Sequence, residues 1–311
     1  MTARERNLFE AVPNISEGRD IAVLDACVAA VEATGTRLLH RTSDPVHNRS
    51  VLTIAGTYEQ LRNAGVALAG ATMERIDLRR HRGIHPRIGA LDVLPFVPLG
   101  DANMGDAVRL ARETAAEIWQ RHAIPSFLYG EAATRPDRTE LADVRRGEFE
   151  GLDARFAATG QRPDYGNVAK HARAGAIAIG ARRILIAFNV VLATDDLAVG
   201  KRIAKRLRAR DGGFQSLKAL ALPLGGERVQ ISLNVTDFRA TPLYRVVEMI
   251  RTLAAREKVT TGPSELIGCL PMEAVAESAA YYLGCARFSP VEEIYTNSAA
   301  CGLHARTEHH R

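Results

Sequence analysis

The sequence predicts an α+β protein in which one β-α-β-β-α-β order of elements occurs twice along the chain. Two observations support this prediction. Strand-like and helix-like hydrophobic spacings follow one another in that order over the first hundred residues, and the second half of the chain repeats the order. A split βαβ arrangement of this kind is the ferredoxin-like unit. Two units in one chain predict two lobes with a cleft between them, and such clefts are common ligand sites.

The first unit shows both helix and strand signals. Ile21, Leu24 and Val28 have the spacing of one apolar helix face. Thr57 and Gln60 have the spacing of a capping box, which predicts that a second helix begins there. The predicted elements are a strand at 7–15, a helix at 20–33, strands at 36–41 and 49–56, a helix from Thr57 to about Ile76, and a strand at 90–99.

The second unit has the same signals. Gly225-Gly226 predicts a hairpin between two strands. Thr241-Pro242 predicts a helix start with proline at the first helical position, where its missing N–H is harmless. The predicted elements are a strand at 184–192, a basic helix at 197–210, strands at 217–224 and 228–238, a helix to about Lys258, and a strand at 264–270.

A longer segment from about 100 to 182 separates the two units. We therefore expect an N-terminal subdomain over residues 1–182, a C-terminal subdomain over 183–305, and a tail at 306–311.

Composition narrows the class of function. A net charge of +5 suits an anionic small molecule, and aromatic residues, at 5%, are not interleaved with basic ones as nucleic-acid binding would require. No apolar run approaches the ~18 residues that span a bilayer. The N-terminus has no secretory apolar region, so we expect a cytoplasmic protein with no membrane partner. The four cysteines form no C-x-x-C pair, and we expect no metal.

The stretch H-R-G-I-H-P-R-I-G at residues 81–89 is the strongest candidate for chemistry. Pro86 pushes His85 out of helical geometry, and glycines flank it. An imidazole displayed in this way suits proton transfer near neutral pH. His81 and His85 would form a metal pair on a helix, but Gly83 and Pro86 argue against a helix. A histidine on an ordinary surface loop is the alternative interpretation.

Neighbouring residues favour the functional interpretation. The guanidinium of Arg87 can donate two parallel hydrogen bonds to a carboxylate. Asp92 interrupts an apolar strand, so it should be paired or functional; it could orient His85 or Arg87, or it could cap nearby backbone N–H groups. The turn S-D-P-V-H-N-R is dense in polar groups that could bind a substrate, namely Asp44, His47, Asn48 and Arg49.

Polar residues also fall on strands of the second unit. Asn189 lies within an apolar strand, where a buried amide requires partners. Alternation places Ser232 and Asn234 on one strand face, which is either a solvated face or a binding surface.

Several motifs together resemble the glutamate formimidoyltransferase family. They include V-P-N-I-S-E-G-R (12–19), H-P-R-I-G-A-L-D-V-L-P-F-V-P (85–98), L-I-A-F-N-V-V-L (185–192) and S-E-L-I-G-C-L-P (264–271). The likeness runs in order from about residue 8 to about residue 285. The resemblance implies two ferredoxin-like subdomains, a homodimer, and a role in histidine breakdown and one-carbon metabolism. It also implies an enzyme that transfers the formimidoyl group from N-formimidoyl-L-glutamate to N5 of tetrahydrofolate, its co-substrate.

The resemblance also implies roles for particular residues. The histidine of the H-P-R motif is the catalytic one, which is His85 here. The family commonly has proline where this chain has Asn167, so the loop departs from the family pattern there. The folate-contacting loop falls on Gly166, Asn167, Val168, Ala169, Lys170, His171, Ala172, Arg173, Ala174 and Gly175.

From this resemblance we hypothesise that Arg49 and Arg87 clamp substrate carboxylates, with Lys170 as a further cation. The polar edge of the pterin is expected to meet Asn189, Asn234 or Glu265. Two alternatives stay open. One is a related folate-dependent formyl- or formimidoyltransferase with a different donor. The other is a non-catalytic folate-binding protein.

Overall fold

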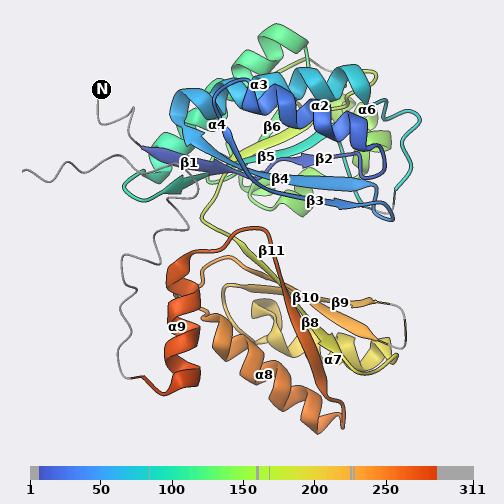
Figure 1. The fold of residues 1–311 in the computed structure, drawn as a ribbon. Helices are drawn as coiled ribbons and strands as arrows, with labels where there is room; N and C mark the ends of the chain where they lie inside the picture. The colour runs from blue at the N-terminus through green and yellow to red at the C-terminus, as the bar shows by residue number, and fades with distance from the viewer. Residues whose placement is uncertain are drawn as a thin grey trace, which may run out of the picture. The chain divides into compact units, whose positions relative to one another are not determined.

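The computed structural model describes residues 7–285 except residues 84, 159–160, 168, 225 and 227. The chain divides into two compact units, Met1–Arg183 and Ile184–Arg311. Each unit has its own sheet, helices and buried core, which confirms the predicted α+β class (Figure 1). The predicted tail at 306–311 lies outside the described residues. The cleft between the subdomains stays a prediction.

Unit 1 begins with the predicted order of elements, but its first strand is in two pieces. These elements are β1 (Leu8–Ala11), β2 (Asn14–Ile15), α2 (Ile21–Glu32), β3 (Arg37–Asp44), β4 (Arg49–Thr57), α3 (Tyr58–Arg75) and β5 (Leu91–Leu99). The single strand predicted at 7–15 is therefore wrong. Pro13 has no N–H to donate to the ladder, although its carbonyl accepts from the backbone of Leu52 at 3.1 Å.

The unit 1 sheet has a ferredoxin-like centre with two added strands. β1 and β2 lie between β4 and β5 and pair antiparallel with both, while β3 pairs with β4. β7 (Ile177–Ala181) adds to β5 in parallel, and β6 (Ser126–Gly130) adds to β7. The sequence indicated the 100–182 segment only as a connection. Its remaining elements are α4 (Met104–His122), η1 (Pro136–Arg138), α5 (Leu141–Val144) and α6 (Glu148–Ala157).

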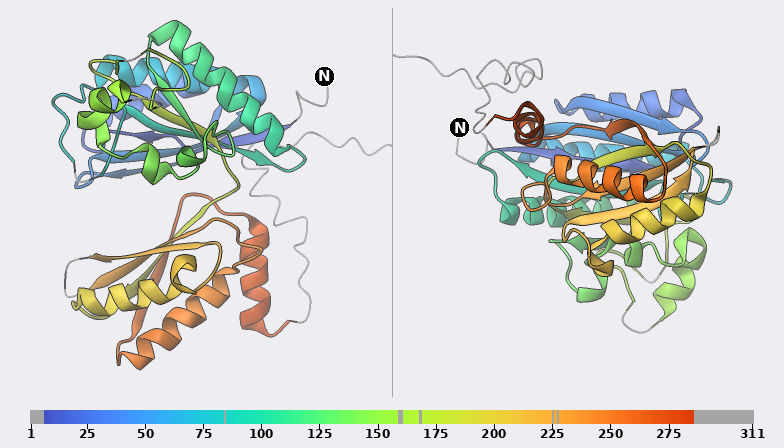
Figure 2. Two further views of the ribbon diagram at one scale, coloured as in Figure 1. Left: turned by 180° about the vertical axis from the view of Figure 1, so that it is seen from behind. Right: turned by 90° about the horizontal axis from the view of Figure 1, so that it is seen from below.

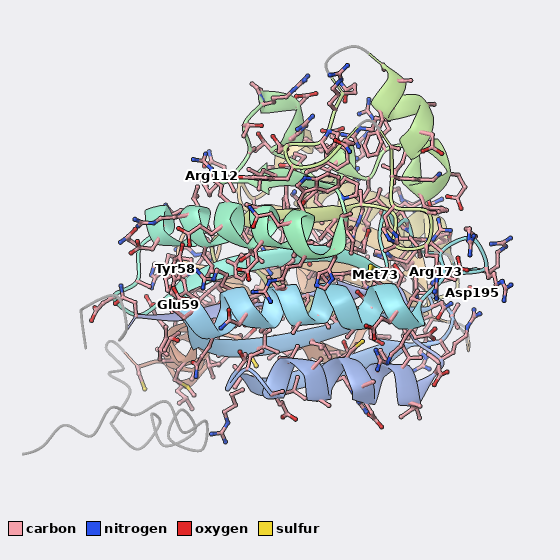
Figure 3. The ribbon with its side chains drawn as sticks, turned by 90° about the horizontal axis from the view of Figure 1, so that it is seen from above. Tyr58, Glu59, Met73, Arg112, Arg173 and Asp195 are labelled. Carbon is pink, nitrogen blue, oxygen red and sulfur yellow. The ribbon has the colours of Figure 1, made fainter. Side chains whose placement is uncertain are left out.

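Three helices cover one face of the unit 1 sheet. α2, α3 and α4 lie side by side over the strands, as the view from above shows (Figure 3). The capping box at the start of α3 is confirmed, because the side chain of Gln60 accepts from the backbone of Thr57 at 2.8 Å and the Thr57 hydroxyl accepts in return. Leu61, Leu68 and Phe96 are fully buried beneath these helices.

Unit 2 has the complete ferredoxin-like order. Its elements are β8 (Ile186–Leu192), α7 (Leu197–Leu207), η2 (Ala209–Asp211), β9 (Leu217–Pro223), β10 (Val229–Val235), α8 (Leu243–Arg256), β11 (Thr261–Ile267) and α9 (Met272–Leu283). The strands pair antiparallel in the order β11-β8-β10-β9. α7 and α8 lie on the same face of this sheet (Figure 2), where Phe188 and Ile231 are buried.

Some predicted boundaries in unit 2 are wrong by a few residues. Pro242 is the N-cap of α8 and not its first helical residue, because its ψ of 142° is extended. α7 ends at Leu207, since Arg208 is also extended. The closing strand stops before Gly268, whose φ of 78° leaves strand geometry. Gly225 of the predicted hairpin lies outside the described residues. Among the described residues, none of the helices has the length and apolar character of a membrane span.

Candidate functional site

His85 lies on the loop between α3 and β5, near the point where β2 ends and β4 and β5 begin. Asn48 holds this loop in place. The side-chain oxygen of Asn48 accepts from the backbone N–H of Gly18 at 2.9 Å, and its amide donates to the carbonyl of Arg82 at 3.0 Å. The backbone carbonyl of Asn48 is bonded to Nε2 of His81 at 3.1 Å. The side chain of Asn48, expected to bind substrate, therefore supports the loop that carries His85.

The close approach of these segments depends on Gly18. A Cβ atom at this position would lie 2.3 Å from the backbone oxygen of Asp44 and 2.6 Å from the backbone nitrogen of Arg49. Both obstacles are backbone atoms, which cannot rotate away as a side chain can. The glycine of the S-E-G-R motif is thus required for the turn that bears Arg49 to pack beside it.

His85 and Arg49 form a direct hydrogen bond. Nη1 of Arg49 lies 2.8 Å from Nε2 of His85. A guanidinium can only donate, so Nε2 must accept through its lone pair. In the neutral ring, the proton is therefore on Nδ1.

The surroundings keep this imidazole neutral. Burial is the largest of the causes that lower the pKa of His85 to about 3. The charges of Arg49, Arg145 and His47 act in the same direction. At neutral pH His85 can therefore accept a proton but has none to spare on Nε2, which is the protonation state that a general base requires.

Asp92 is a buried carboxylate, 2% exposed, beside this loop. It accepts from the backbone N–H of Ile88 at 2.7 Å and from Nε of Arg145 at 3.0 Å. Of the two roles considered from the sequence, capping the backbone is the one observed. Arg145 supplies the charge that a buried carboxylate needs, and it was not predicted.

Arg87 bonds to a set of residues that does not include His85. Its guanidinium donates to Glu150 at 2.8 Å and to Glu148 at 3.1 Å, and its Nε donates to His81 at 3.2 Å. The hydrogen bond with Glu150 is the main cause that raises the pKa of Arg87. This group lines a cavity of about 690 Å³, together with residues such as Phe149.

Asp44 and His47 pair with each other across the turn between β3 and β4. Nδ1 of His47 lies 2.6 Å from a carboxylate oxygen of Asp44, and the backbone N–H of His47 donates to the other oxygen at 2.9 Å. Partial burial acts to raise the pKa of Asp44, but the hydrogen bonds from His47 outweigh it and lower that pKa. The carboxylate is therefore hydrogen-bonded to a neighbouring histidine and not to Arg49, although its charge also acts on Arg49.

The predicted folate loop is attached to the His85 loop. Gly175 and His171 exchange two backbone hydrogen bonds, at 2.8 Å and 2.9 Å. Gly175 has a φ of 73°, and a Cβ there would lie 2.1 Å from the carbonyl oxygen of Ile88, so only glycine fits. Lys170 donates to the carbonyl of Phe149 at 2.9 Å and pairs with Asp153 at 3.0 Å.

Other residues of this loop differ in exposure. Arg173 lies beside the end of α3, near Met73 (Figure 3), and donates to the carbonyl of Glu74 at 3.1 Å. The ring of His171 accepts from the backbone of Ala174 at 3.0 Å. Val168 lies outside the described residues, and the exposed positions of the loop are Asn167, Ala169 and Ala172.

The three predicted site residues of unit 2 share one face of its sheet. The amide of Asn189 donates to Glu265 at 3.2 Å across the β8–β11 pair. Ser232 lies opposite Asn189, so Asn234, two residues further along β10, is on the same face. Asn189 is buried and Asn234 is exposed. The amide therefore has the partner that its burial requires.

Comparisons with known proteins give the family. The formiminotransferase domain, N-terminal subdomain, matches residues 8–182, and the formiminotransferase domain matches residues 187–299. The chain belongs to the formiminotransferase family. It is 40% identical over 292 residues to the glutamate formimidoyltransferase of Streptococcus pyogenes serotype M1, covering 93% of this chain and 98% of that protein. It is 43% identical over 281 residues to the glutamate formimidoyltransferase of Thermoplasma acidophilum, covering 89% and 92%.

A longer relative matches over part of its length. The formimidoyltransferase-cyclodeaminase of Rattus norvegicus is 35% identical over 295 residues, which is 92% of this chain and 54% of that protein. These matches confirm the resemblance to glutamate formimidoyltransferase that the sequence motifs indicate.

Sequence reasoning missed Arg145 in this formiminotransferase chain. The residue follows α5, and 53 positions separate it from its partner Asp92. Asp92 gave an indirect signal, because a carboxylate within the apolar strand β5 requires a cation from another part of the chain. Many arginines in the chain could have met that requirement. Among the described residues, no group of three or more His, Cys, Asp or Glu side chains is placed to hold a metal ion.

Proposed function

We propose that this chain is a glutamate formimidoyltransferase, which moves the formimidoyl group of N-formimidoyl-L-glutamate to N5 of tetrahydrofolate. The observation that supports this most directly is the imidazole of His85, which its surroundings keep neutral and which lies within 2.8 Å of a cation, Arg49, that could bind a donor carboxylate. The chain's identity of 40% and 43% to two proteins named glutamate formimidoyltransferase supports the same reaction.

The proposed reaction requires one proton to pass between two nitrogens. The lone pair of N5 attacks the amidine carbon of the donor, forming a C–N bond and a tetrahedral intermediate. Nε2 of His85 takes the proton from N5. When the bond from that carbon to the glutamate nitrogen breaks, the imidazolium returns the proton to the departing amine. The imidazole ends neutral, as it began, and general acid–base catalysis of this kind contributes ~10²–10⁴-fold.

Arg49 is the best placed of the three predicted cations to bind a donor carboxylate. Arg87 and Lys170 already have acidic partners, Glu150 and Asp153. Arg49 has no ion pair within 4.0 Å to any carboxylate of the described residues. A guanidinium binds a carboxylate through two parallel hydrogen bonds, which would fix the donor beside His85.

The folate is assigned to the loop Gly166–Gly175. Two features of the loop fit a bulky co-substrate. Residues 167, 169 and 172 are exposed, and the bridge between Gly175 and Gly89 fixes the end of the loop beside the segment that follows His85. That Asn189, Asn234 or Glu265 meets the polar edge of the pterin stays a prediction from the sequence. We also propose that the protein is a homodimer and that it acts in histidine breakdown in the cytoplasm.

The test is an assay of the purified protein with tetrahydrofolate and three donors: formimidoyl-glutamate, formimidoyl-glycine and formyl-glutamate. We expect turnover with formimidoyl-glutamate alone. Preference for another donor would replace the proposal with a related transferase. The absence of turnover with every donor, together with folate binding, would leave a non-catalytic folate-binding protein.

A matched variant tests the role of His85. His85→Ala should lower kcat by roughly 10²–10⁴-fold, the contribution expected of a general base. Tetrahydrofolate binding, measured by equilibrium dialysis, should stay within about tenfold, because the loss is one of proton transfer. If kcat survives in this variant, His85 is not the base.

A further inference from the structure

The contact between Arg49 and His85 conflicts with catalysis as it stands. Nε2 of a neutral imidazole has one lone pair, and Arg49 occupies it at 2.8 Å. The other ring nitrogen bears the proton, and the backbone at Pro86 is its neighbour. A base held in this way cannot accept a proton from a substrate until the guanidinium moves.

The carboxylates whose charges act on Arg49 are already bonded to other groups, so Arg49 bonds to the imidazole. The carboxylates of Asp92 and Asp44 act on its charge. Asp92 is bonded to Arg145 and to the Ile88 backbone, and Asp44 is bonded to His47. A guanidinium bonded to a neutral ring forms a weaker pair than one bonded to a carboxylate, whose charge-assisted hydrogen bonds are about twice as strong.

We propose that a carboxylate of the bound substrate draws Arg49 away from Nε2 of His85, so that the base becomes available only in the loaded site. This inference rests on the proposed function for the identity of the carboxylate, which is that of the glutamate donor. Arg49 is thus a positioning residue that acts through His85. It recognises one substrate and, in doing so, uncovers the group that removes the proton from the other.

The exchange also brings the basicity of His85 nearer to what catalysis needs. The groups that face His85 are Arg49 from β4, His47 from the preceding turn and Arg145 from the segment after α5. Arg145 and His47 have acidic partners, Asp92 and Asp44, that partly balance them. A carboxylate that neutralises Arg49 would remove the largest unbalanced charge, and the pKa of His85 would rise toward the range suited to proton transfer.

Nitrogen NMR of the wild-type protein tests this exchange without turnover. The Nδ1 and Nε2 signals of ¹⁵N-labelled His85, assigned by their loss in His85→Gln, are recorded at pH 7, where the ring is neutral and both carboxylates of the probe are ionised. The probe is glutarate, a dicarboxylate of the donor's chain length, and the control is uncharged glutaramide. We expect glutarate to move the Nε2 signal, because the lone pair of that nitrogen loses its hydrogen bond from Arg49, and glutaramide to leave the signal unchanged. Equal behaviour with both compounds would overturn the inference.

Two variants sharpen the test. Arg49→Gln should move the Nε2 signal of His85 in the same direction without any ligand, and glutarate should then add no further shift. Arg82→Gln is the matched control, because this variant also loses one positive charge near His85, but Arg82 bonds to the backbone carbonyl of His81. If both variants move the signal equally, the direct contact is not the cause and the inference fails. If Arg49→Gln does not fold, the wild-type experiment decides alone.

The NMR experiment and the activity assay can fail independently, so failure of the proposed exchange can be told apart from failure of the proposed function. A protein that responds to glutarate as expected but transfers no formimidoyl group would refute the function and retain the exchange. A protein that transfers the group while its His85 signals ignore glutarate would retain the function and refute the exchange.

Discussion

Arg49 and Arg87 are alike in the sequence but unlike in the structure. Both lie near His85 or its loop, and both were expected to clamp a carboxylate. Arg87 is 7% exposed and pairs with two acidic residues, Glu148 and Glu150. Arg49 donates instead to the neutral ring of His85. The comparison teaches that two arginines with the same predicted role can differ in whether the fold supplies each with a carboxylate.

The two arginines also affect their histidine neighbours differently. Arg87 donates to His81, whose pKa is lowered mainly by burial and whose Nε2 is bonded to a backbone carbonyl. His81 therefore has both nitrogens engaged by the protein itself. The second nitrogen of His85 has the backbone at Pro86 as its neighbour, and Nε2 is bonded to Arg49, the partner that we propose a substrate carboxylate displaces. Only the second arrangement leaves an imidazole nitrogen that a ligand can uncover.

The largest effect should come from removing the carboxylate that satisfies Arg145. Asp92→Asn leaves this largely buried arginine without a counter-charge, and we expect the free energy of unfolding to fall by roughly 3–5 kcal/mol. Urea denaturation measures it. The double variant Asp92→Asn, Arg145→Met should lose less than Asp92→Asn alone, since no buried charge is left unpaired. A loss below about 1 kcal/mol in the single variant would show that the pair does not fix this loop.

The next largest effect is a kinetic one, and it should differ between variants of Arg49 and Arg87. Arg49→Gln should lower kcat/KM for formimidoyl-glutamate by roughly 10–150-fold, the loss of one charged hydrogen bond of about 1.5–3 kcal/mol. The effect should fall mainly on KM. Arg87→Gln is the matched control and should change KM by less than about threefold, while lowering stability. Equal kinetic losses in the two variants would remove the distinction between the two regions.

The sequence was sufficient for the repeated order of elements, and it singled out His85, whose catalytic role stays a prediction. Local signals carried these predictions, including the capping box at Thr57 and the proline that follows the histidine. β6 and β7 were missed because each is only five residues long and joins the sheet in parallel, without a hairpin to mark it. Pro13 divided a strand that hydrophobicity alone made continuous.

The difference between Arg49 and Arg87 could not be predicted. The acidic partners of Arg87 lie 61 and 63 positions further along the chain, and no local pattern connects them. Arg145 reaches Asp92 across a similar separation of 53 positions. The packing of α5 and α6 determines which charged residues pair across such separations. The sequence therefore identifies several candidate cations but does not show which of them lacks an acidic partner.

A smaller effect concerns the pH dependence of stability. The pKa of His85 is about 3 in the folded protein, below the ~6.5 of an unfolded chain. Between these values the unfolded state binds one more proton at this site, so the contribution of His85 to stability is lost as pH falls from 6.5 toward 3. The unfolding free energy of the wild type, minus that of His85→Gln, should therefore decrease over this window. A difference that stays constant with pH would mean that the ring is not held neutral by its surroundings.

The smallest change in stability and KM should come from a substitution at Glu150, one of the acidic partners of Arg87. Its side chain is 61% exposed, and an exposed ion pair contributes only about 0–1 kcal/mol. Glu150→Gln should therefore change the melting temperature little, because Glu148 still pairs with Arg87. It should also leave KM for formimidoyl-glutamate within about twofold of the wild-type value, because the partner that it releases is not the arginine assigned to the donor. A clear fall in KM would mean that a freed Arg87 can bind substrate, and that acidic pairing alone separates the two arginines.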